Sequence, residues 1–336
     1  MALPPLEADE SLQHVDEVAQ TTSETAIHGR SPTRIAMERL RKDKVAVICA
    51  GVILFFILVA IFAPLITRAF GVELRSYPGS EIIDINTTYG KVGPPDHGFT
   101  WDHPLGVEKG TGNDLLAEWV YGCRTSLLVA TISTTLSTLI GIVVGLLAGF
   151  SRGWLDRGLT FVIDVFLSFP FILGALMLAP IIYSHFAADA EKLGQAQFWA
   201  LIGVLTIFTW MPLARLIRGE VFSLREREFI QAARVIGVPT RRILFRELLP
   251  NLIAPIVIFY SLVLPALVTA EAGLAYLGIG LTERPSWGQT VNKSVQFFEE
   301  FPLWLWAPVL GIIALVLALN LLGDSIRDAF DPKTRR

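Results

Sequence analysis

Of the 336 residues in this chain, 52% are hydrophobic and 18% are charged, and the mean hydropathy is +0.53, so the chain is too apolar for a soluble globular protein. Two cysteines, Cys49 and Cys123, exclude a disulfide framework and show no metal-ligand spacing. The net charge of −3 says little by itself, because the distribution of charge along a membrane protein matters more than its sum.

The chain begins with a polar segment, residues 1–44. Its first 30 residues include six acidic residues and show no sustained apolar period, which predicts a partly disordered tail. The first apolar run starts only at Val45, directly after Arg39, Arg41, Lys42 and Lys44. Because this run is long, lies far from the start and is followed by five more, we expect a retained span and not a cleaved signal peptide.

Six apolar runs are each close to the roughly 20 residues that a helix needs to cross hydrocarbon. They are Val45–Thr67, Ser126–Phe150, Leu159–Ser184, Phe198–Ala214, Leu252–Ala270 and Pro302–Gly323. The sequence therefore predicts an all-α, polytopic membrane protein with six transmembrane helices in a domain over residues 45–323 and a short tail over 324–336. An even number of spans places both termini on one side.

Lys and Arg are distributed unevenly between the two sides. One side holds 20 basic residues, whereas the three loops on the opposite side hold 8. The richer side consists of segments 1–44, 151–158, 215–251 and 324–336. Short loops rich in these residues stay in the cytoplasm. We therefore expect cytoplasmic termini, a cytoplasmic loop over 215–251 and an external loop over 68–125. Retention of basic loops in the cytoplasm also explains the basic residues between Arg215 and Arg246, so these residues do not require a nucleic-acid-binding role.

The external loop carries a run of short motifs. His103-Pro104-Leu105-Gly106 is followed by Gly112-Asn113-Asp114, and then by Gly122, Arg124, Ser126 and Leu127. Within it, Asp114–Tyr121 has the pattern of a short amphipathic helix whose apolar side chains are available for the membrane interface.

Small residues form a stripe along the second span. Ser133, Ser137, Gly141, Gly145 and Gly149 recur at intervals of four, which places them on one helix face and lets another helix approach closely. The pattern predicts structural packing. It leaves open whether the neighbouring helix belongs to this chain or to a second subunit.

Two acidic residues near spans are candidates for a pathway or gate, because a charge in hydrocarbon is costly and usually has a partner or water. Asp164 lies five residues into the third span, and Glu271 follows the apolar part of the fifth. Interfacial or structural roles are favoured, with Asp164 near the inner face and Glu271 near the outer face. Prolines in these spans, Pro170, Pro180, Pro212, Pro255 and Pro265, suit a gate or simple packing.

The segment Gln231–Asn251 (QAARVIGVPTRRILFRELLPN) is the most informative part of the chain. Ala232 and Ala233 would let a partner surface come close, Gly237 can take the positive φ that ends a helix, and Pro239 can open the next helix. The pattern predicts a compact knob of two short helices joined at a glycine. The Ala-Ala pair alone would equally suit an ordinary amphipathic connector.

This segment resembles the cytoplasmic coupling motif of permeases of ABC importers, which reads Glu-Ala-Ala, three residues, Gly, and a spacer ending in Leu-Pro. Five residues of this segment match the motif, namely Ala232, Ala233, Gly237, Leu249 and Pro250. Gln231 replaces the usual glutamate, and Glu247 stands where many members carry an apolar residue. The resemblance implies a type I permease fold in which Gln231, Ala232, Ala233, Gly237, Thr240, Arg241, Arg242, Leu249 and Pro250 contact an ATPase.

The external motifs and the C-terminal third resemble the second, C-type permease of the dipeptide, oligopeptide and nickel branch. The C-terminal motifs are Glu271–Gly280, Pro285–Gly288, Asn320–Asp324 and Arg327–Pro332. In the external loop, Val107-Glu108, Asn113 and Ala117-Glu118 depart from the branch pattern. The resemblance implies a permease that lies in the cytoplasmic membrane of a prokaryote and works by alternating access. Peptides are the leading predicted substrates, and nickel or another small solute is the alternative.

The resemblance also implies partners. These are a homologous second permease, two cytoplasmic ATP-binding subunits that hold ATP and Mg, an external substrate-binding protein and membrane lipid. We expect no cofactor and no metal on this chain, because it has no Gly-Lys-Ser/Thr phosphate loop and all five histidines lie outside the spans. The competing classes are a secondary transporter or channel without ATPases, which gives no reason for the coupling motif, and a membrane scaffold.

Overall fold

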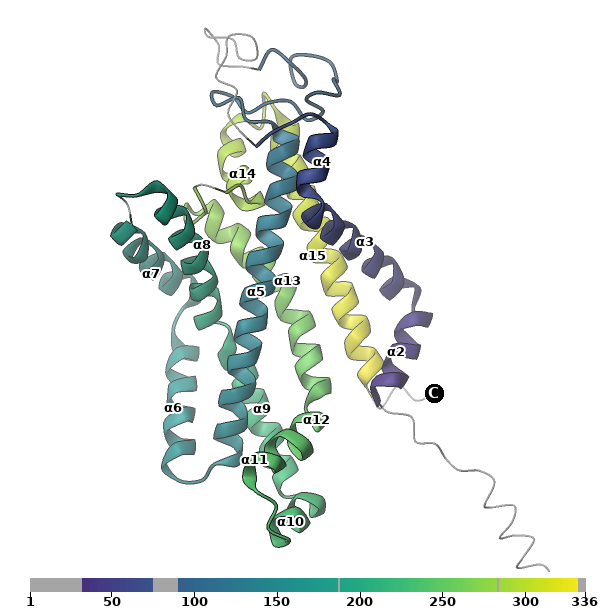
Figure 1. Cartoon of the computed structure of the whole chain (residues 1–336), viewed down its shortest axis with the longest axis vertical. Coiled ribbons are helices and arrows are strands. Elements are labelled where there is room, and N and C mark those ends of the chain that lie inside the picture. Colours follow the sequence, from purple (N-terminus) through teal and green to yellow (C-terminus); the bar gives the residue numbers. More distant parts are fainter. Residues whose placement is uncertain (1–31, 75–89, 187, 283, 332–336) are drawn as a thin grey trace, which may run out of the picture.

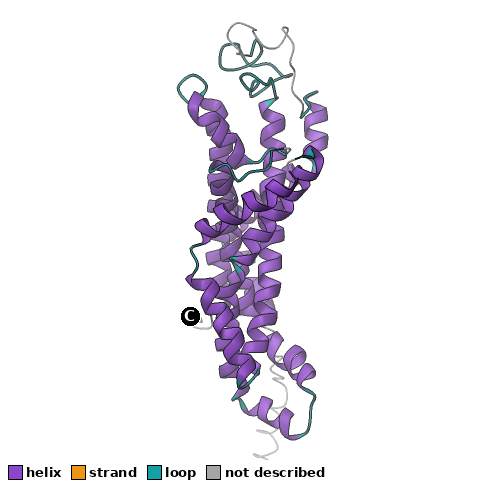
Figure 2. Ribbon diagram, turned by 90° about the vertical axis from the view of Figure 1, so that its left-hand side faces the viewer, coloured by secondary structure: helices purple, strands orange, loops and turns teal. Residues whose placement is uncertain are grey.

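The computed structural model describes residues 32–74, 90–186, 188–282 and 284–331. Helices dominate these ranges and form an elongated bundle (Figures 1 and 2). Within them, no residue is assigned to a strand, and an isolated bridge pairs Val107 with Asp114. The predicted all-α class is confirmed.

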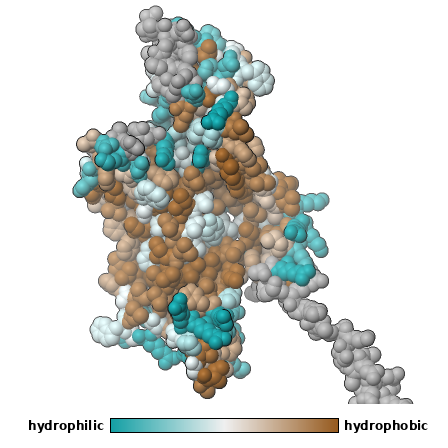
Figure 3. All heavy atoms as spheres, viewed as in Figure 1, coloured by the Kyte–Doolittle hydropathy of each residue, from teal (hydrophilic) through white to brown (hydrophobic). Residues whose placement is uncertain are grey.

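Among the described residues, five helical segments are long and apolar enough to cross a membrane, and a bent pair makes a sixth if it is counted as one span. On the face seen in Figure 3, apolar side chains form a broad belt across the middle of the bundle, between more polar ends. The five segments are α3 (Lys44–Ile61), α5 (Leu115–Phe150), α8 with α9 (Ala190–Ile207 and Trp210–Arg225), α13 (Ile253–Tyr276) and α15 (Pro302–Phe330), and the pair is α6 (Trp154–Ser168) with α7 (Phe171–Phe186).

The third predicted span is not one straight helix. Its two halves, α6 and α7, meet at an angle of 90°. Phe169, between them, has extended backbone angles of φ −85° and ψ 128°. Proline disfavours helical angles in the residue before it, so Pro170 explains why the helix stops at this point. The length of this apolar run was predicted correctly, but the 90° change of direction between its two halves was not.

The first and last helices of the described chain meet at one end of the bundle. The amphipathic helix α2 (Pro32–Lys42) packs against the end of α15, where the Arg39 guanidinium donates to the Ala329 carbonyl at 3.2 Å. Nearby, the Ser325 hydroxyl donates to the Asp43 carboxylate at 2.6 Å. Segments that are far apart in sequence are thus tied together on one side. Between α3 and the external segment lies the short helix α4 (Ala63–Ala69).

The small-residue stripe on α5 packs against α9, within the same chain. A Cβ built on Gly141, Gly145 or Gly149 would lie 2.7–2.9 Å from the Cβ atoms of Leu213, Ile217 and Val221, respectively. Separations this short show that only glycine permits the observed approach of the two backbones. The question that the sequence left open is therefore answered: the neighbour of the three glycines is an intramolecular helix.

The predicted helix Asp114–Tyr121 is the N-terminal end of α5 and not a separate helix. Asp114 caps α5 by accepting from the Ala117 N–H at 2.8 Å, and the helix continues without a break. Leu115 and Val120 are buried in the bundle. Gly122, inside this helix, makes room for the Trp287 side chain, which lies 3.0 Å from its ideal Cβ position.

Two buried acidic residues and a partly exposed lysine form a cluster at the N-terminal end of α5. The Lys293 ammonium, on α14 (Trp287–Ser294), lies 3.2 Å from the carboxylates of both Glu108 and Glu118. The Asn113 side-chain amide donates to the same two carboxylates. Because these residues come from the segment before α5, from α5 and from α14, the cluster holds three segments together. The short 3₁₀ turn η2 (Val295–Phe297) follows α14.

Candidate coupling site

The segment that resembles a coupling motif forms a compact projection at one end of the bundle (Figure 1). Helix α9 continues to Arg225, so the first part of the predicted 215–251 loop is helical. The projection then consists of α10 (Glu228–Val235), α11 (Thr240–Arg242), a π-type turn η1 (Ile243–Leu248) and α12 (Leu249–Asn251). We call residues 226–251 the coupling knob.

Gly237 ends α10 in the predicted way. Its φ is +78°, in the left-handed region that favours glycine. The Gly237 N–H donates to the Arg234 carbonyl at 3.1 Å, and the Val238 N–H donates to the Ala233 carbonyl at 2.9 Å. This pair of bonds is a Schellman motif, which satisfies carbonyl groups that the end of a helix leaves without partners.

The chain after Gly237 also follows the prediction. Pro239 has extended angles and stands at the cap of α11, where its carbonyl accepts from the Arg242 N–H at 2.8 Å. Pro250 lies in the first turn of α12, where its missing N–H costs no helical bond. Two short helical pieces joined at a glycine are therefore present.

Buried apolar residues fix the knob to the bundle. Ile230, Ile243 and Leu248 are each at most 1% exposed and pack with Ile217 and Val221 of α9. Two of the motif residues, Ala233 and Leu249, are partly buried against this cluster. They therefore hold the knob in place and present little surface to a partner.

Two arginines join the knob and its base to the end of α5. The Arg225 guanidinium donates to the Gly149 carbonyl at 3.1 Å. The Arg234 guanidinium lies over the Phe150 ring, 4.8 Å from its centroid. The knob is thus connected to α5 as well as to α9, so a displacement of the knob acts on both helices.

The outer surface of the knob combines polar motif residues with apolar side chains that the sequence analysis missed. Gln231, Ala232, Thr240, Arg241, Arg242 and Pro250 are exposed. Val235 is 87% exposed and Ile236 is 78% exposed on either side of the α10 end, and Phe245 is 57% exposed. The sequence did offer a signal for this exposed apolar surface, because Val235 and Ile236 stand beside the helix-ending Gly237 in a loop outside the spans.

The two predicted pathway residues are not brought together. Asp164 on α6 forms an ion pair with Arg215 on α9, and both side chains are more than half exposed. A second pair, Asp156 with Arg218 at 2.8 Å, links the same two helices. These contacts support a structural role for Asp164 at the end of the bundle that carries the knob.

Glu271 belongs to α13 and is completely buried in the protein. Its position near the outer face of the membrane stays a prediction, because burial inside the protein does not give depth in a membrane. The Glu271 carboxylate lies beside the buried hydroxyls of Ser126 and Ser286, and neither carboxylate oxygen has a hydrogen bond of normal geometry among the described residues. The α13 helix continues past the apolar run to Tyr276, which carries Glu271 into the core.

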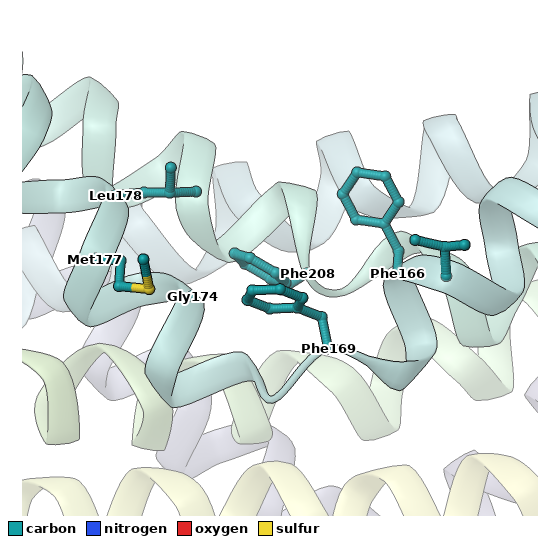
Figure 4. A pocket seen from close by; sticks show the side chains of 7 residues that line it. Phe166, Phe169, Gly174, Met177, Leu178 and Phe208 are labelled. Atoms are coloured by element: carbon teal, nitrogen blue, oxygen red, sulfur yellow. The ribbon is translucent and has the colours of Figure 1, made fainter.

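The breaks in two neighbouring helical segments meet at a cluster of aromatic rings. Phe169, at the α6–α7 bend, stacks on Phe208, at the α8–α9 break, with ring centroids 6.0 Å apart (Figure 4). An apolar cavity of about 260 Å³ lies here, lined also by Phe166, Gly174 and Met177. Pro170 was a sequence signal for the first break, and Phe208 was not recognised.

Comparison with known proteins agrees with this architecture. The family described as binding-protein-dependent transport system inner membrane component matches residues 141–336, and the N-terminal transmembrane domain of oligopeptide transport permease C matches residues 31–78. Among solved structures, the inward-facing methionine ABC transporter MetNI is similar in fold, with a TM-score of 0.51, 22% sequence identity and coverage of 65% of this chain and 98% of that chain.

Relatives match over most of their length. The chain is 34% identical over 309 residues to the dipeptide transport system permease protein DppC of Alkalihalophilus pseudofirmus, which covers 91% of each chain. It is 32% identical over 307 residues to the glutathione transport system permease protein GsiD of Salmonella typhimurium, covering 91% of this chain and 92% of the relative. The chain therefore belongs to the family of binding-protein-dependent transport system inner membrane components.

Proposed function

We propose that this permease is the transmembrane subunit of an ATP-driven importer that moves di- and oligopeptides across the cytoplasmic membrane of a prokaryote. The observation that carries the proposal is the coupling knob, a rigid projection with an exposed apolar tip. The names of the dipeptide and glutathione relatives support peptides as the substrate class.

The knob is the contact for the ATPase subunits, which hold ATP and Mg, while this chain catalyses no reaction. Val235 and Ile236 would insert into an apolar depression of the partner, because an exposed apolar pair in water is stabilised by burial. Arg241 and Arg242, both exposed beside them, would meet an acidic rim. Movement of the ATPases then acts on α5 and α9 through the anchored base of the knob.

The remaining partners follow from this role. A second, homologous permease completes the passage, and an external binding protein delivers the peptide at the opposite end of the bundle. The excess of basic residues in 1–44, 151–158, 215–251 and 324–336 supports a cytoplasmic knob and cytoplasmic termini. Transport by alternating access would expose the passage first to one side and then to the other.

The test is substitution of Gly237 in the assembled transporter. Gly237→Val forces a β-branched residue into left-handed backbone at a cost of about 1–2 kcal/mol, which should distort the knob and reduce both ATPase attachment and ATP-dependent peptide uptake. Nothing lies within 4 Å of an ideal Cβ at this position, so a steric clash is not the cause.

Gly237→Asn is the matched control, because asparagine adopts left-handed backbone more readily and should retain most uptake. Membrane insertion of both variants is checked by quantifying the subunit in washed membranes. Normal peptide uptake and normal ATPase attachment in an inserted Gly237→Val variant would contradict the role of the knob.

A further inference from the structure

A cavity of about 380 Å³ opens at the end of the bundle opposite the knob. It lies between α5, the start of α8 and the segment that leads into α14. Its lining includes Tyr121, Arg124, Thr125, Phe198, Arg284 and Pro285. The cavity thus combines two cations with aromatic walls.

Arg124 and Arg284 have no acidic partner within ion-pair distance among the residues that the structure describes. The Arg284 guanidinium lies over the Phe198 ring at 5.2 Å from its centroid, which holds this side chain at the cavity. Arginine stays charged at any physiological pH. Two like charges in one hollow repel each other, and a bound anion would offset that repulsion.

The cavity continues into an exposed polar face on α5. Arg124, Leu128, Thr131 and Thr135 follow one another at helical spacing and are all exposed. The Thr135 hydroxyl lies 3.2 Å from the Tyr260 hydroxyl of α13, which widens the polar strip. Exposed faces elsewhere carry aliphatic residues, such as Leu310, Ile313 and Leu317 on α15.

The charge of Arg124 on a face that points away from the bundle favours water or solute over lipid, because a charged side chain is costly in hydrocarbon. The Thr135 hydroxyl has protein partners in the Thr131 carbonyl and the Tyr260 hydroxyl, so it carries less of this argument. The strip therefore has the character of a passage wall. Its upper end is the cavity with the two arginines. A solute that moved along this wall from the outer side would meet Arg124 and Arg284 first.

We propose that the cavity between Arg124 and Arg284 binds the carboxylate of the transported peptide before it enters the passage. This rests on the proposed function and names the group that the permease recognises. Every linear peptide with a free C-terminus carries this group whatever its side chains are, and the planar guanidinium matches a carboxylate with two parallel hydrogen bonds. Tyr121 and Phe198 supply apolar surface for varied neighbouring groups.

The charge of the cavity can be measured with Leu128→Cys in the assembled transporter, reconstituted in phosphatidylcholine nanodiscs. Anionic and cationic methanethiosulfonate reagents of similar size are compared, because a positive cavity accelerates the anionic reagent selectively. Replacing both arginines, Arg124→Gln with Arg284→Gln, should lower the anionic-to-cationic rate ratio by about tenfold or more. Cys49 and Cys123 are buried, and the parent transporter, which lacks the introduced thiol, gives the background.

Peptide binding is read from the same thiol. A dipeptide with a free carboxylate should slow the anionic reagent, and its C-terminal amide should not. Lys192→Gln is the matched control, since this exposed lysine lies outside the cavity and pairs with Asp189. The control should keep both the rate ratio and the protection. A second double variant carries Arg124→Lys with Arg284→Gln. It should recover part of the anionic-to-cationic rate ratio, because lysine returns one positive charge.

Three results would overturn the proposal. The first is an anionic-to-cationic rate ratio that the double substitution does not change, and the second is equal protection of the thiol by the free dipeptide and its amide. The third is a slower reaction of the anionic reagent when phosphatidylglycerol is added to the nanodiscs, with no change in that rate when dipeptide is added. The last result would assign the cavity to a lipid headgroup. Failure of the proposed function is distinguishable, because it would show as absent ATP-dependent peptide uptake in the parent transporter, whatever the reagents report.

Discussion

Lys293 is the positive charge of the ionic cluster at the end of the bundle opposite the knob. Its ammonium bridges the Glu108 and Glu118 carboxylates, whose side chains are only 5% and 3% exposed. Burial alone would lower the pKa of Lys293, but the two carboxylates outweigh it and raise the pKa above its ordinary value of 10.5. The lysine is therefore charged throughout the neutral range. The stability from this raised pKa is fully present below pH 10.5 and lost as the pH rises through the folded-state value.

We predict that Lys293→Met destabilises the permease by about 3 kcal/mol, since removing one partner leaves buried carboxylates without a counter-charge. This is the lower end of the range for a broken buried pair, because the Lys293 side chain is 35% exposed. The measurement is the denaturation midpoint of the purified transporter in detergent.

Lys192→Met removes an exposed ion pair with Asp189 and should change stability by less than about 1 kcal/mol. Adding Glu108→Gln to Lys293→Met should recover part of the loss, because it removes one of the stranded charges. Equal midpoints for Lys293→Met and Lys192→Met would show that the cluster is not a structural tie.

At the scale of elements, the contact between α5 and α9 relies on glycine. An ideal Cβ on Gly145 lies 2.7 Å from the Ile217 Cβ and 2.8 Å from the Ala214 carbonyl oxygen. The carbonyl belongs to the backbone, so it cannot move aside without shifting α9. Overpacking of this kind costs roughly 1–3 kcal/mol.

Gly145→Ala is therefore expected to lower the thermal stability of the assembled transporter, and because α9 carries the knob, it should also reduce ATP-dependent uptake. Gly219→Ala, on α9, is the matched control, since nothing lies within 4 Å of its ideal Cβ. Thermal midpoint and uptake are measured for both variants. If the two alanine variants behave alike, close approach at Gly145 is not what holds the helices together.

Much of the helical framework could be predicted from the sequence, because apolar length and helix-ending residues act locally. The left-handed backbone at Gly237 and the start of α11 after Pro239 both follow from the residue types. The bend at Phe169 was not predicted, although Pro170 was noticed, because hydropathy measures the length of an apolar run and is blind to its direction.

The candidate sites were harder to predict, since they depend on which segments meet. The burial of Glu271 in the protein was not predicted, because the helix that carries it extends past the apolar run and packs against α5 and α14. Arg124 was noticed only as part of a motif, because its counterpart Arg284 is distant in sequence. Val235 and Ile236 gained meaning only when the structure showed them exposed.

At the scale of the whole molecule, α10 of the knob and α14 lie at opposite ends of the bundle (Figure 1). The Arg124–Arg284 cavity is lined by residues just before α14 and near the start of α5. If the knob is cytoplasmic, Asp96→Cys in the external loop should react with an impermeant thiol reagent added to intact cells. Thr240→Cys on the knob should react only after permeabilisation. Both positions are exposed, so access and not burial decides the outcome. The reverse labelling pattern would overturn the orientation and the ATPase contact together.

The length of α5 has a mechanical consequence. Its 36 residues, at a rise of about 1.5 Å each, make a rod of about 54 Å, compared with roughly 30 Å of hydrocarbon. Arg225 and Arg234 contact the C-terminal end of this helix, and its N-terminal end carries Glu118 of the cluster with Lys293. If α5 pivots near its C-terminal end, a tilt of about 10° would displace the N-terminal end by about 9 Å. A small displacement beside the knob would thus become a larger one at the opposite end of α5.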